Sequence, residues 1–526
     1  MKRRDFLQNT IPAAVLPSLV GNYSFRVLGD NPVMAALLNT YVETDRVLVI
    51  IQLNGGNDGL NMVIPLDQYS NYYNARSNIA IAQNKVLTLS GTNAVGLHPS
   101  MTGLQTLYNN GKLRLVQAVG YPNPNFSHFR ATDIWMSAAD SDEQLTSGWG
   151  GRYLNDQYPN YPVGYPNTTV PDPLGIQIGS SASLAFQGPS VNMGISISSA
   201  TNFYNLINGI QDPVPATRAG DALQYVRLVA QQANQYSTRI SAAAAAVPTQ
   251  GTYPTSNTLA DQLKIVARLI KGGLKTRVYM VSMGGFDTHS AQTNTDTSTG
   301  NHATLMQRLS DAVKAFQDDL QGMGIEDRVL GMTFSEFGRR IKSNASTGTD
   351  HGAAAPMFVF GTKVNPGVSG VNPTIPTTAT VNDNIPMQFD FRSVYSSILQ
   401  NWFCVDNTTL ETIMLQNFQQ LGICASGNCS TITDVNDIRN AGIKLISNYP
   451  NPFTTSTTIS FTTKGGHTLV QIMDSLGRVI QTPVDRTYAA GKYQVTFEGY
   501  ALPAGVYYMR FQNGMTQQVK PMLKVR

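Results

Sequence analysis

The most constraining feature of the sequence is a repeated pattern in which a short apolar run is followed at once by glycine and polar residues. Val278–His289 begins with β-prone apolar residues, which are typical of a strand buried on both faces. Gly284-Gly285 ends that run, and Asp287 and His289 follow with one residue between them. Because open α/β sheets bind ligands at the carboxyl ends of their strands, these side chains are candidates for a site. The alternative is that Asp287 forms a turn or a helix cap and His289 lies on an ordinary loop.

Three further stretches carry the same pattern. The strand expected over residues 46–53 ends in an Asn/Gly/Asp-rich segment, which is either a ligand-binding loop or a tight turn. The strand expected over 328–334 runs into Ser-Glu-Phe-Gly-Arg-Arg, and a glycine-flanked Asp-His pair precedes a strand expected over 357–360. Carboxylates and imidazoles without cysteine suit Zn, Mn, Mg or Ca. The candidate metal ligands in these stretches are Asp58, Glu336, Asp350 and His351.

The order of elements predicts an α/β fold. A helix expected over residues 100–109 is followed by a strand over 112–119, which indicates a strand–helix–strand unit and a mostly parallel sheet. Apolar residues at helical spacing predict packing helices over 216–247 and 258–274, and another helix begins at His302. Residues 149–209 are rich in Pro, Gly, Ser and Asn, so we expect irregular structure with short strands there.

A serine stands at the start of another expected helix. Pro122 and Pro124 exclude regular structure, and the helix is expected over residues 126–138. Ser127 would then lie at the helix N-terminus, where unpaired amides and the helix dipole favour an anion. Ser127 is therefore a candidate nucleophile with His128 as its neighbour. It is equally a candidate N-cap, which is the commoner use of serine at this position.

Composition and charge narrow the class of protein. A chain of 526 residues indicates at least two domains, and only 13% of residues are charged, as is common in secreted proteins. Residues 441–526 contain nine Lys/Arg against three Asp/Glu, so the excess of positive charge belongs to this C-terminal part. The sequence has no basic stripe with interleaved aromatic residues, and nucleic acid is not expected as a partner.

The two ends of the chain and its cysteines bear on its compartment. Arg3-Arg4 ahead of a short apolar run resembles a twin-arginine export signal over residues 1–30, with a merely basic N-terminus as the alternative. No stretch of about 20 apolar residues occurs, so no transmembrane span is expected. Cys424 and Cys429 flank a short turn that a disulfide would close in an oxidising compartment, whereas Cys404 is expected to be a buried thiol.

Five ordered motifs within residues 44–421 carry a family resemblance. NGGNDGLNMVIP, NFSHFRATDIW, GGFDTHSAQ, FSEFGRRIKSN and GTDHGAAAP resemble domain of unknown function 1501, which is similar to sulfatases and alkaline phosphatases. The resemblance implies an alkaline-phosphatase-like α/β/α sandwich with a mostly parallel sheet. Larger relatives bind two metals at strand ends and attack phosphate or sulfate esters with a serine or threonine.

The resemblance also implies roles for individual residues. Asp58 corresponds to the carboxylate ligand of the first strand, Asp287 and His289 to one metal's ligands, Glu336 to the acid of the second metal, and His351 with Asp350 to the late histidine ligand. Ser127 is the implied nucleophile, and Arg130 or Arg339 is expected to hold substrate oxygens. The resulting hypothesis is a secreted or cell-surface hydrolase of phosphate or sulfate esters that uses a divalent metal, with Zn favoured. The alternative is a surface protein on a degenerate hydrolase scaffold, either non-catalytic and binding glycans or purely structural.

The C-terminal segment resembles a different family. ISNYPNPFTTSTTISF, VQIMDSLGRVI and LPAGVYYMRFQNG resemble the C-terminal sorting domain of the Bacteroidetes type IX secretion system. Strands alternating with turn residues independently predict a small all-β sandwich over residues 441–526, preceded by a linker over 422–440. The resemblance implies the type IX secretion machinery as a partner. It also implies a protein that passes through the periplasm to the cell surface, at the outer membrane.

Overall fold

The computed structural model describes residues 45–179, 183–198, 235–424, 446–449, 451–474, 478–513 and 516–525. The chain divides into two compact units, with the boundary between Ser426 and Gly427. The expected export signal, Cys429 and nearly all of the expected linker lie outside the described residues, as does most of the helix expected over 216–247.

A nine-stranded sheet forms the centre of the first unit, with the order β11-β5-β10-β9-β1-β8-β6-β7 and with β12 beside β5. β1 is parallel to both of its neighbours, β8 and β9, whereas β10 is antiparallel to β9 and β5. The sheet is thus mixed and mostly parallel, as the sequence predicts. Its strands are β1 (Val47–Leu53), β5 (Leu113–Gly120), β6 (Gly175–Ile178), β7 (Gly194–Ile197), β8 (Val278–Met283), β9 (Val329–Phe334), β10 (Ala355–Phe360), β11 (Gly367–Ser369) and β12 (Phe389–Asp390).

The sequence of β1 explains why the sheet is covered on both faces. All seven of its residues are buried, and alternate side chains enter two different cores. Val49 and Ile51 pack into one core, whereas Leu48 and Ile50 pack into the other. A strand that presents apolar side chains on both faces requires a layer of helices on each side.

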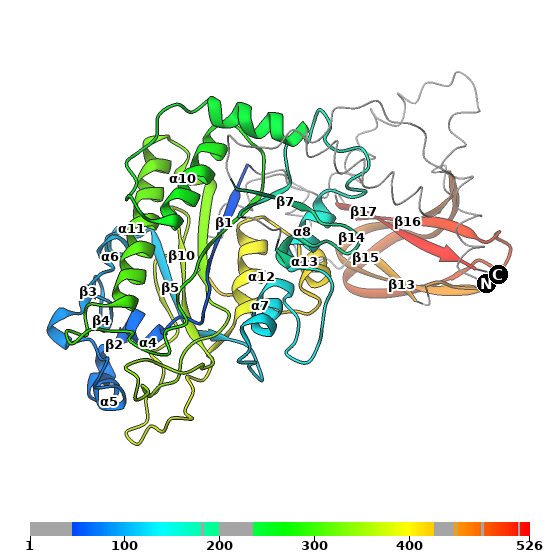
Figure 1. Cartoon of the computed structure of the whole chain (residues 1–526). Helices are drawn as coiled ribbons and strands as arrows, with labels where there is room; N and C mark the ends of the chain where they lie inside the picture. Colours follow the sequence, from blue (N-terminus) through cyan, green and yellow to red (C-terminus); the bar gives the residue numbers. More distant parts are fainter. Residues whose placement is uncertain are drawn as a thin grey trace, which may run out of the picture. The chain divides into compact units, whose positions relative to one another are not determined.

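Helices supply those two layers (Figure 1). One core contains side chains from α6 (Thr102–Asn109), α10 (Thr258–Lys271) and α11 (Asn301–Gly322). The other contains side chains from α7 (His128–Ser137), α8 (Trp149–Gln157), α12 (Phe391–Asn401) and α13 (Asn407–Met414). In α10, Leu259, Leu263, Val266 and Ile270 recur at helical spacing and are all buried, which fixes the face that the helix turns to the sheet.

A smaller group of elements follows β1 in the sequence. It contains α4 (Gly59–Met62), α5 (Tyr69–Ala75) and a three-stranded sheet of β2 (Val63–Pro65), β4 (Thr92–Leu97) and β3 (Leu87–Leu89). The region expected to be irregular, 149–209, does contain the short strands β6 and β7. It also contains α8, whose Trp149, Tyr153 and Leu154 are buried, so packing overrides the local abundance of glycine and proline.

The second unit is an antiparallel β structure, as predicted. Its five-stranded sheet has the order β13-β14-β16-β17, with β15 beside β14. Phe461, Ile472 and Phe511 are among the buried side chains of a separate core. The strands are β13 (Ile446–Tyr449), β14 (Ser456–Met473), β15 (Val479–Glu498), β16 (Gly505–Asn513) and β17 (Thr516–Lys524).

The structure also bears on the cysteines and on candidate membrane-spanning helices. Cys424 is a free, buried thiol, and it is Cys404 that is disulfide-bonded, so the expected Cys424–Cys429 pairing and the free thiol at Cys404 are both wrong. Burial raises the pKa of Cys424 to about 12, which keeps it protonated and unreactive. Among the described residues, no helix is long and apolar enough to cross a membrane.

Candidate metal centre

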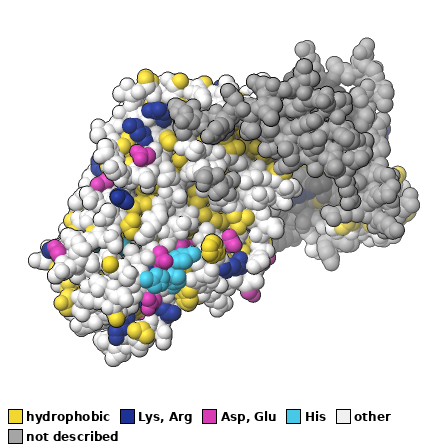
Figure 2. Space-filling view, in the orientation of Figure 1, with side chains coloured by type: hydrophobic (Ala, Val, Ile, Leu, Met, Phe, Trp, Pro, Cys, Tyr) yellow, Lys and Arg dark blue, Asp and Glu magenta, His cyan; other side chains and the backbone are white. Residues whose placement is uncertain are grey.

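Four chain segments bring polar side chains to one edge of the large sheet. The parallel strands β1, β8 and β9 all end at this edge, and the polar segments after them begin there. Because β10 runs in the opposite direction, it starts at the same edge, and His351 lies just before it. Histidine and acidic side chains gather in one patch on the face drawn in Figure 2.

The centre of this patch is formed by His128, Asp287 and His351, called the open group below. Each of the three offers one ligand atom, and these atoms lie within 4.8 Å of one another. His128 Nε2 is 3.5 Å from Asp287 Oδ2, and His351 Nε2 is 3.3 Å from Asp287 Oδ1. The two imidazole rings meet edge to face with centroids 4.6 Å apart. The group is partly exposed, so an ion or a substrate can reach it.

Both histidines of the open group are oriented through their other ring nitrogen. His128 Nδ1 is 2.7 Å from Glu336 Oε1, and His351 Nδ1 is 2.8 Å from the carbonyl oxygen of Phe126. A carbonyl oxygen only accepts hydrogen bonds, so His351 carries its proton on Nδ1. In both rings Nε2 is the atom that faces Asp287.

Asp287 is held ionised by its surroundings. Partial burial opposes ionisation, but the hydrogen bond and charge of Arg339, with help from His289 and His351, lower the pKa of Asp287 to about 2. Arg339 Nη2 donates to Asp287 Oδ1 at 2.6 Å, and His289 Nδ1 lies 2.8 Å from the same oxygen. Oδ2 faces His128 instead. A carboxylate with one oxygen held by Arg339 and the other turned to the imidazole of His128 suits a metal ligand.

Arg339 itself is completely buried and binds backbone. It donates to the carbonyl oxygens of Gly55, Gly56, Phe286 and Thr349, in addition to Asp287. This guanidinium therefore ties the ends of β1 and β8 to the segment before β10. The expected contact with substrate oxygens is replaced by a role in positioning Asp287.

Two glycines allow these segments to approach. Gly55 and Gly56 have φ values of +125° and +75°. A Cβ on Gly55 would lie 2.4 Å from the amide nitrogen of Asp287, and one on Gly56 would lie 2.2 Å from the ring of Phe337. The Gly-Gly pair after β1 is thus needed for close packing beneath the site. It also lets the amide of Gly55 donate to Glu336 Oε1 at 2.8 Å.

Asp58 does not join the open group. It lies in a second cluster with Arg76 and Gln292, called the closed group below. Arg76 Nη1 donates to both carboxylate oxygens at 2.7 and 2.8 Å, and Gln292 Nε2 donates to Oδ2 at 2.6 Å. Burial opposes ionisation, but the charges of Arg76 and His302 and these hydrogen bonds keep the pKa of Asp58 below its usual value.

Two further histidines lie close to the closed group and were not singled out as a pair by the sequence. His302 Nε2 is 3.2 Å from Asn57 Oδ1, and the rings of His302 and His98 meet edge to face at 5.9 Å. Burial lowers the pKa of His302 to about 4 and that of His98 to about 3. Both are therefore neutral structural groups at physiological pH.

The remaining predicted residues surround the open group without entering it. Ser127 is the exposed N-cap residue of α7, and its side chain makes no capping hydrogen bond. Arg130 donates to backbone carbonyls of Asp140, Ser141 and Glu143. Asp350 is exposed and accepts from Asn344 at 3.0 Å.

Glu336 is fully buried and contacts the open group only through His128. The sequence predicts Glu336 as a metal ligand and His128 as the neighbour of the nucleophile, whereas in the structure His128 joins the open group and Glu336 supports it. The available signal was that His128 starts a helix directly after β5, at the same sheet edge as Asp287.

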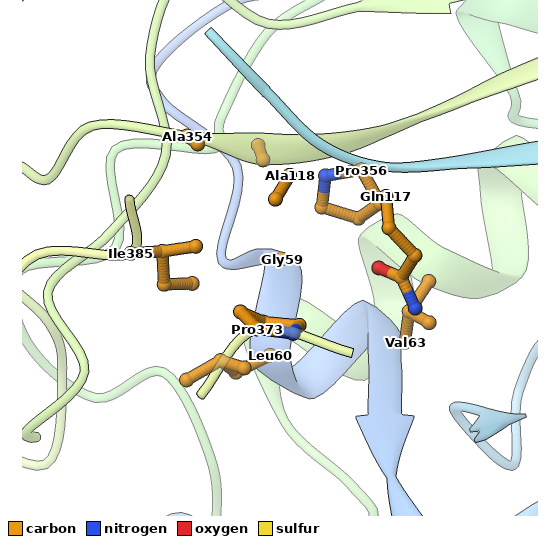
Figure 3. A pocket seen from close by; sticks show the side chains of 10 residues that line it. Gly59, Leu60, Val63, Gln117, Ala118, Ala354, Pro356, Pro373 and Ile385 are labelled. Carbon is orange, nitrogen blue, oxygen red and sulfur yellow. The ribbon is translucent and has the colours of Figure 1, made fainter. Parts of the chain in front are cut away.

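Two cavities lie near this edge. The smaller lies between α4, β5 and β10, and Figure 3 shows Gly59, Leu60 and Pro356 around it. Its volume of about 10 Å³ is enough for a single water at most. The larger has a volume of about 330 Å³ and is lined by residues after β5, before β10 and before β12.

Two family profiles match the sequence. The profile described as "Protein of unknown function (DUF1501)" matches residues 45–406, which is more than half of the chain. The profile described as "Secretion system C-terminal sorting domain" matches residues 447–524. With this sorting domain the protein is handled by the type IX secretion system and exported to the cell surface or the outer membrane. No curated protein matches the sequence.

Solved structures similar to this chain include a protein in the alkaline phosphatase superfamily and a sulfatase. The first, from Vibrio parahaemolyticus, is 10% identical to this chain. The match covers 91% of this chain and 83% of that protein, with a TM-score of 0.33. The sulfatase PsFucS1 from Pseudoalteromonas sp. is 10% identical, with coverages of 89% and 86% and a TM-score of 0.31.

PorZ from Porphyromonas gingivalis, a surface component of the type-IX secretion system, is 19% identical over 15% of this chain and 11% of its own, with a TM-score of 0.12. Likenesses of this size carry no information about chemistry.

Proposed function

The chain belongs to the DUF1501 family of proteins of unknown function, and we propose that it is a metal-dependent hydrolase of phosphate or sulfate esters that acts at the cell surface. The single observation that carries this proposal is the convergence of His128, Asp287 and His351. Their ligand atoms come from three separate segments and lie within 4.8 Å at an open sheet edge. Ligand-type side chains far apart in sequence that meet at such an edge are the mark of a site rather than of packing.

The donor set fits a divalent metal. The ligands would be Nε2 of His128, Nε2 of His351 and the carboxylate of Asp287. Two imidazoles and one carboxylate, with space left for substrate, match catalytic zinc, and Mn²⁺ is the next candidate. When bound, such an ion would supply positive charge to an ester oxygen and stabilise the charge that develops during hydrolysis.

The surrounding residues would prepare this site. Glu336 orients His128, the carbonyl of Phe126 orients His351, and Arg339 fixes Asp287. Partners of this kind hold ligands in one orientation and increase their basicity. They would therefore lower the cost of assembling the site around an ion.

Ser127 is the proposed nucleophile. It is exposed, stands one residue before His128, and lies at the N-terminus of the ten-residue helix α7, where backbone amides favour an anion. Its Oγ would form a bond to phosphorus or sulfur and give its proton to solvent. The ester P–O or S–O bond would break, and the alcohol would leave with a proton. Water would then hydrolyse the seryl ester and release phosphate or sulfate.

The proposal involves one ion rather than the two that the family resemblance implies. Asp58 is neutralised by Arg76, and Glu336 is bound to His128 and to the amide of Gly55. The expected first-strand ligand Asp58 and the expected acid of the second metal, Glu336, are thus already paired. This same observation favours a second candidate function, a non-catalytic surface binding protein that keeps one metal site on a degenerate hydrolase scaffold.

Metal content and turnover test the proposal together. Wild type, His351→Ala and the control His467→Ala would be loaded with Zn²⁺ or Mn²⁺, desalted and measured by elemental analysis. His467 is a matched control because it is an exposed histidine beside an aspartate, in the C-terminal unit. Wild type and His467→Ala should retain about one ion, and His351→Ala should lose it.

Hydrolysis of 4-nitrophenyl phosphate and 4-nitrocatechol sulfate would then be assayed. Turnover by wild type that falls at least about a hundredfold in His351→Ala and in Ser127→Ala supports the hydrolase. A protein that retains its ion without any turnover of either ester is a binding protein. A wild type that retains no ion contradicts both functions.

A further inference from the structure

The 330 Å³ cavity lies beside two of the segments that contribute to or support the open group. Ala353, which lines it, lies two residues after His351, and its carbonyl accepts from the amide of Gly338 at 2.8 Å. Gly338 follows Phe337, whose ring packs against His351 with centroids 4.5 Å apart. Pro124, which also lines the cavity, lies two residues before Phe126, whose carbonyl binds His351. The cavity is therefore lined by residues that lie close in sequence to His351 itself and to Phe126, which binds it.

The lining differs in chemistry from the open group. None of the eleven residues around the cavity is charged. Apolar and ring side chains predominate, with two neutral amides, and the hydroxyl of the one tyrosine is already engaged by the backbone of Asn125. The side chains that define the cavity are Tyr121, Pro122, Pro124, Asn384, Pro386 and Met387.

The size of the cavity limits its ligand. Its volume lies at the lower end of the range of about 300–1,000 Å³ found for small-molecule sites. At roughly 30 Å³ per water, it replaces about eleven waters, which suits one ring with its substituents rather than a polymer. A charged group placed there would lose water without gaining a partner.

We infer that this cavity binds the alcohol part of the substrate, and that the substrate is an ester of an uncharged alcohol with a single ring. The inference rests on the proposed function, because the charged phosphate or sulfate lies at the open group while the neutral ring occupies the cavity. Proline and tyrosine faces contact the apolar face of the ring, and the amides of Asn123 and Asn384 meet its hydroxyl groups. A monosaccharide monoester has this chemistry, whereas an ester of an acidic sugar does not.

Binding of three phosphates to the Zn-loaded full-length protein tests the inference by calorimetry. Inorganic phosphate has no ring, glucose 1-phosphate has a neutral ring, and glucuronic acid 1-phosphate has the same ring with a carboxylate. We expect glucose 1-phosphate to bind roughly tenfold more tightly than either of the other two. Equal affinities for glucose 1-phosphate and inorganic phosphate would overturn the inference.

Two variants locate the effect. Met387 lines the cavity and is 40% exposed, so Met387→Trp would obstruct part of the cavity without disturbing a core. This variant should bind glucose 1-phosphate no better than inorganic phosphate, with its affinity for inorganic phosphate unchanged. Val371→Trp is the control, because Val371 is 72% exposed and does not line the cavity. A tenfold preference that survives in Met387→Trp would place the ring elsewhere and overturn the inference.

A second measurement separates this inference from the proposed function. Methyl glucoside carries the ring without any charged group, and its binding at millimolar concentration can be followed by saturation transfer from the protein. Transfer in wild type and Val371→Trp that is lost in Met387→Trp supports the cavity even if no phosphate binds. Equal transfer in all three proteins, or none in wild type, rejects it.

Discussion

The open group and the closed group each contain an aspartate that follows a strand of the same sheet, but the two groups are suited to different tasks. In the closed group, both oxygens of Asp58 are taken by Arg76 and one also by Gln292, and the cluster is buried. In the open group, Asp287 has only one oxygen fixed by Arg339 and stands half exposed beside two imidazoles. An acid with a dedicated cation stabilises the fold, whereas an acid that faces Nε2 of two histidines retains capacity for an ion.

The difference follows from where each arginine directs its donors. Arg76 gives one nitrogen to both oxygens of Asp58 and the others to the carbonyls of Ile341 and Arg340. Arg339 donates to four backbone carbonyls and to a single oxygen of Asp287. Both guanidiniums join distant loops, but only one of them leaves its carboxylate with an oxygen available.

The largest expected effect concerns the closed group. Arg76→Met would leave Asp58 charged and buried without its cation, which costs about 3–5 kcal/mol of unfolding free energy. Urea unfolding followed by tryptophan fluorescence measures this directly, because all three tryptophans (Trp135, Trp149 and Trp402) belong to the first unit.

Lys85→Met is the matched control for that measurement. It removes an ion pair of the same 2.7 Å length, between Lys85 and Asp296, but on the surface. Its cost should stay below about 1 kcal/mol. Equal losses for the two variants would show that burial does not distinguish the closed group. Loss of the bound metal in folded Arg76→Met would show that the two groups are not separate.

A smaller effect is expected from the pH dependence of stability. Burial holds the pKa of His302 at about 4, below the value of about 6.5 in an unfolded chain. Between these two pH values the unfolded chain binds a proton that the folded protein does not. The unfolding free energy therefore falls by about 1.4 kcal/mol for each pH unit as the pH is lowered from about 6.5 to about 4. Above about pH 6.5 this contribution to stability is fully present.

His302→Gln tests this by removing one titrating group. The variant should lose less stability than wild type between pH 6.5 and pH 4, and part of the slope should remain because His98 is buried in the same way. His467→Gln, an exposed histidine in the other unit, should leave the slope unchanged. Identical slopes in wild type and His302→Gln would contradict the neutral buried state of His302.

The parts of the molecule that the sequence predicts are those that local patterns determine. The apolar runs of β1, β8 and β9 predict strands buried on both faces, and the polar residues after them predict a shared sheet edge. From this, Asp287 and His351 are correctly expected to lie near each other. The antiparallel direction of β10 is not encoded locally, because it depends on the loop that returns the chain to the edge at His351.

The parts that sequence reasoning misses depend on contacts across long stretches of chain. Glu336 and His128 are 208 residues apart, and their hydrogen bond makes the histidine a candidate ligand and the acid its support. Asp58 is paired with an arginine only 18 residues away, but Gln292 reaches it across 234 residues. A carboxylate after a strand looks the same in the sequence whether a cation or a histidine will face it.

The smallest expected effect on folding is at His289, which lies beside the open group but is not one of its three residues. It contacts Asp287 Oδ1 at 2.8 Å and is 45% exposed, so His289→Ala should change the unfolding free energy by no more than about 0.5 kcal/mol. Because it helps to orient Asp287, its loss should weaken Zn²⁺ binding by roughly 10–100-fold, as partners of metal ligands do. His351→Ala should weaken binding further, since it would remove a ligand itself. Competition with a chromogenic chelator measures both affinities, and a larger loss in His289→Ala than in His351→Ala would place His289 in the ligand set instead.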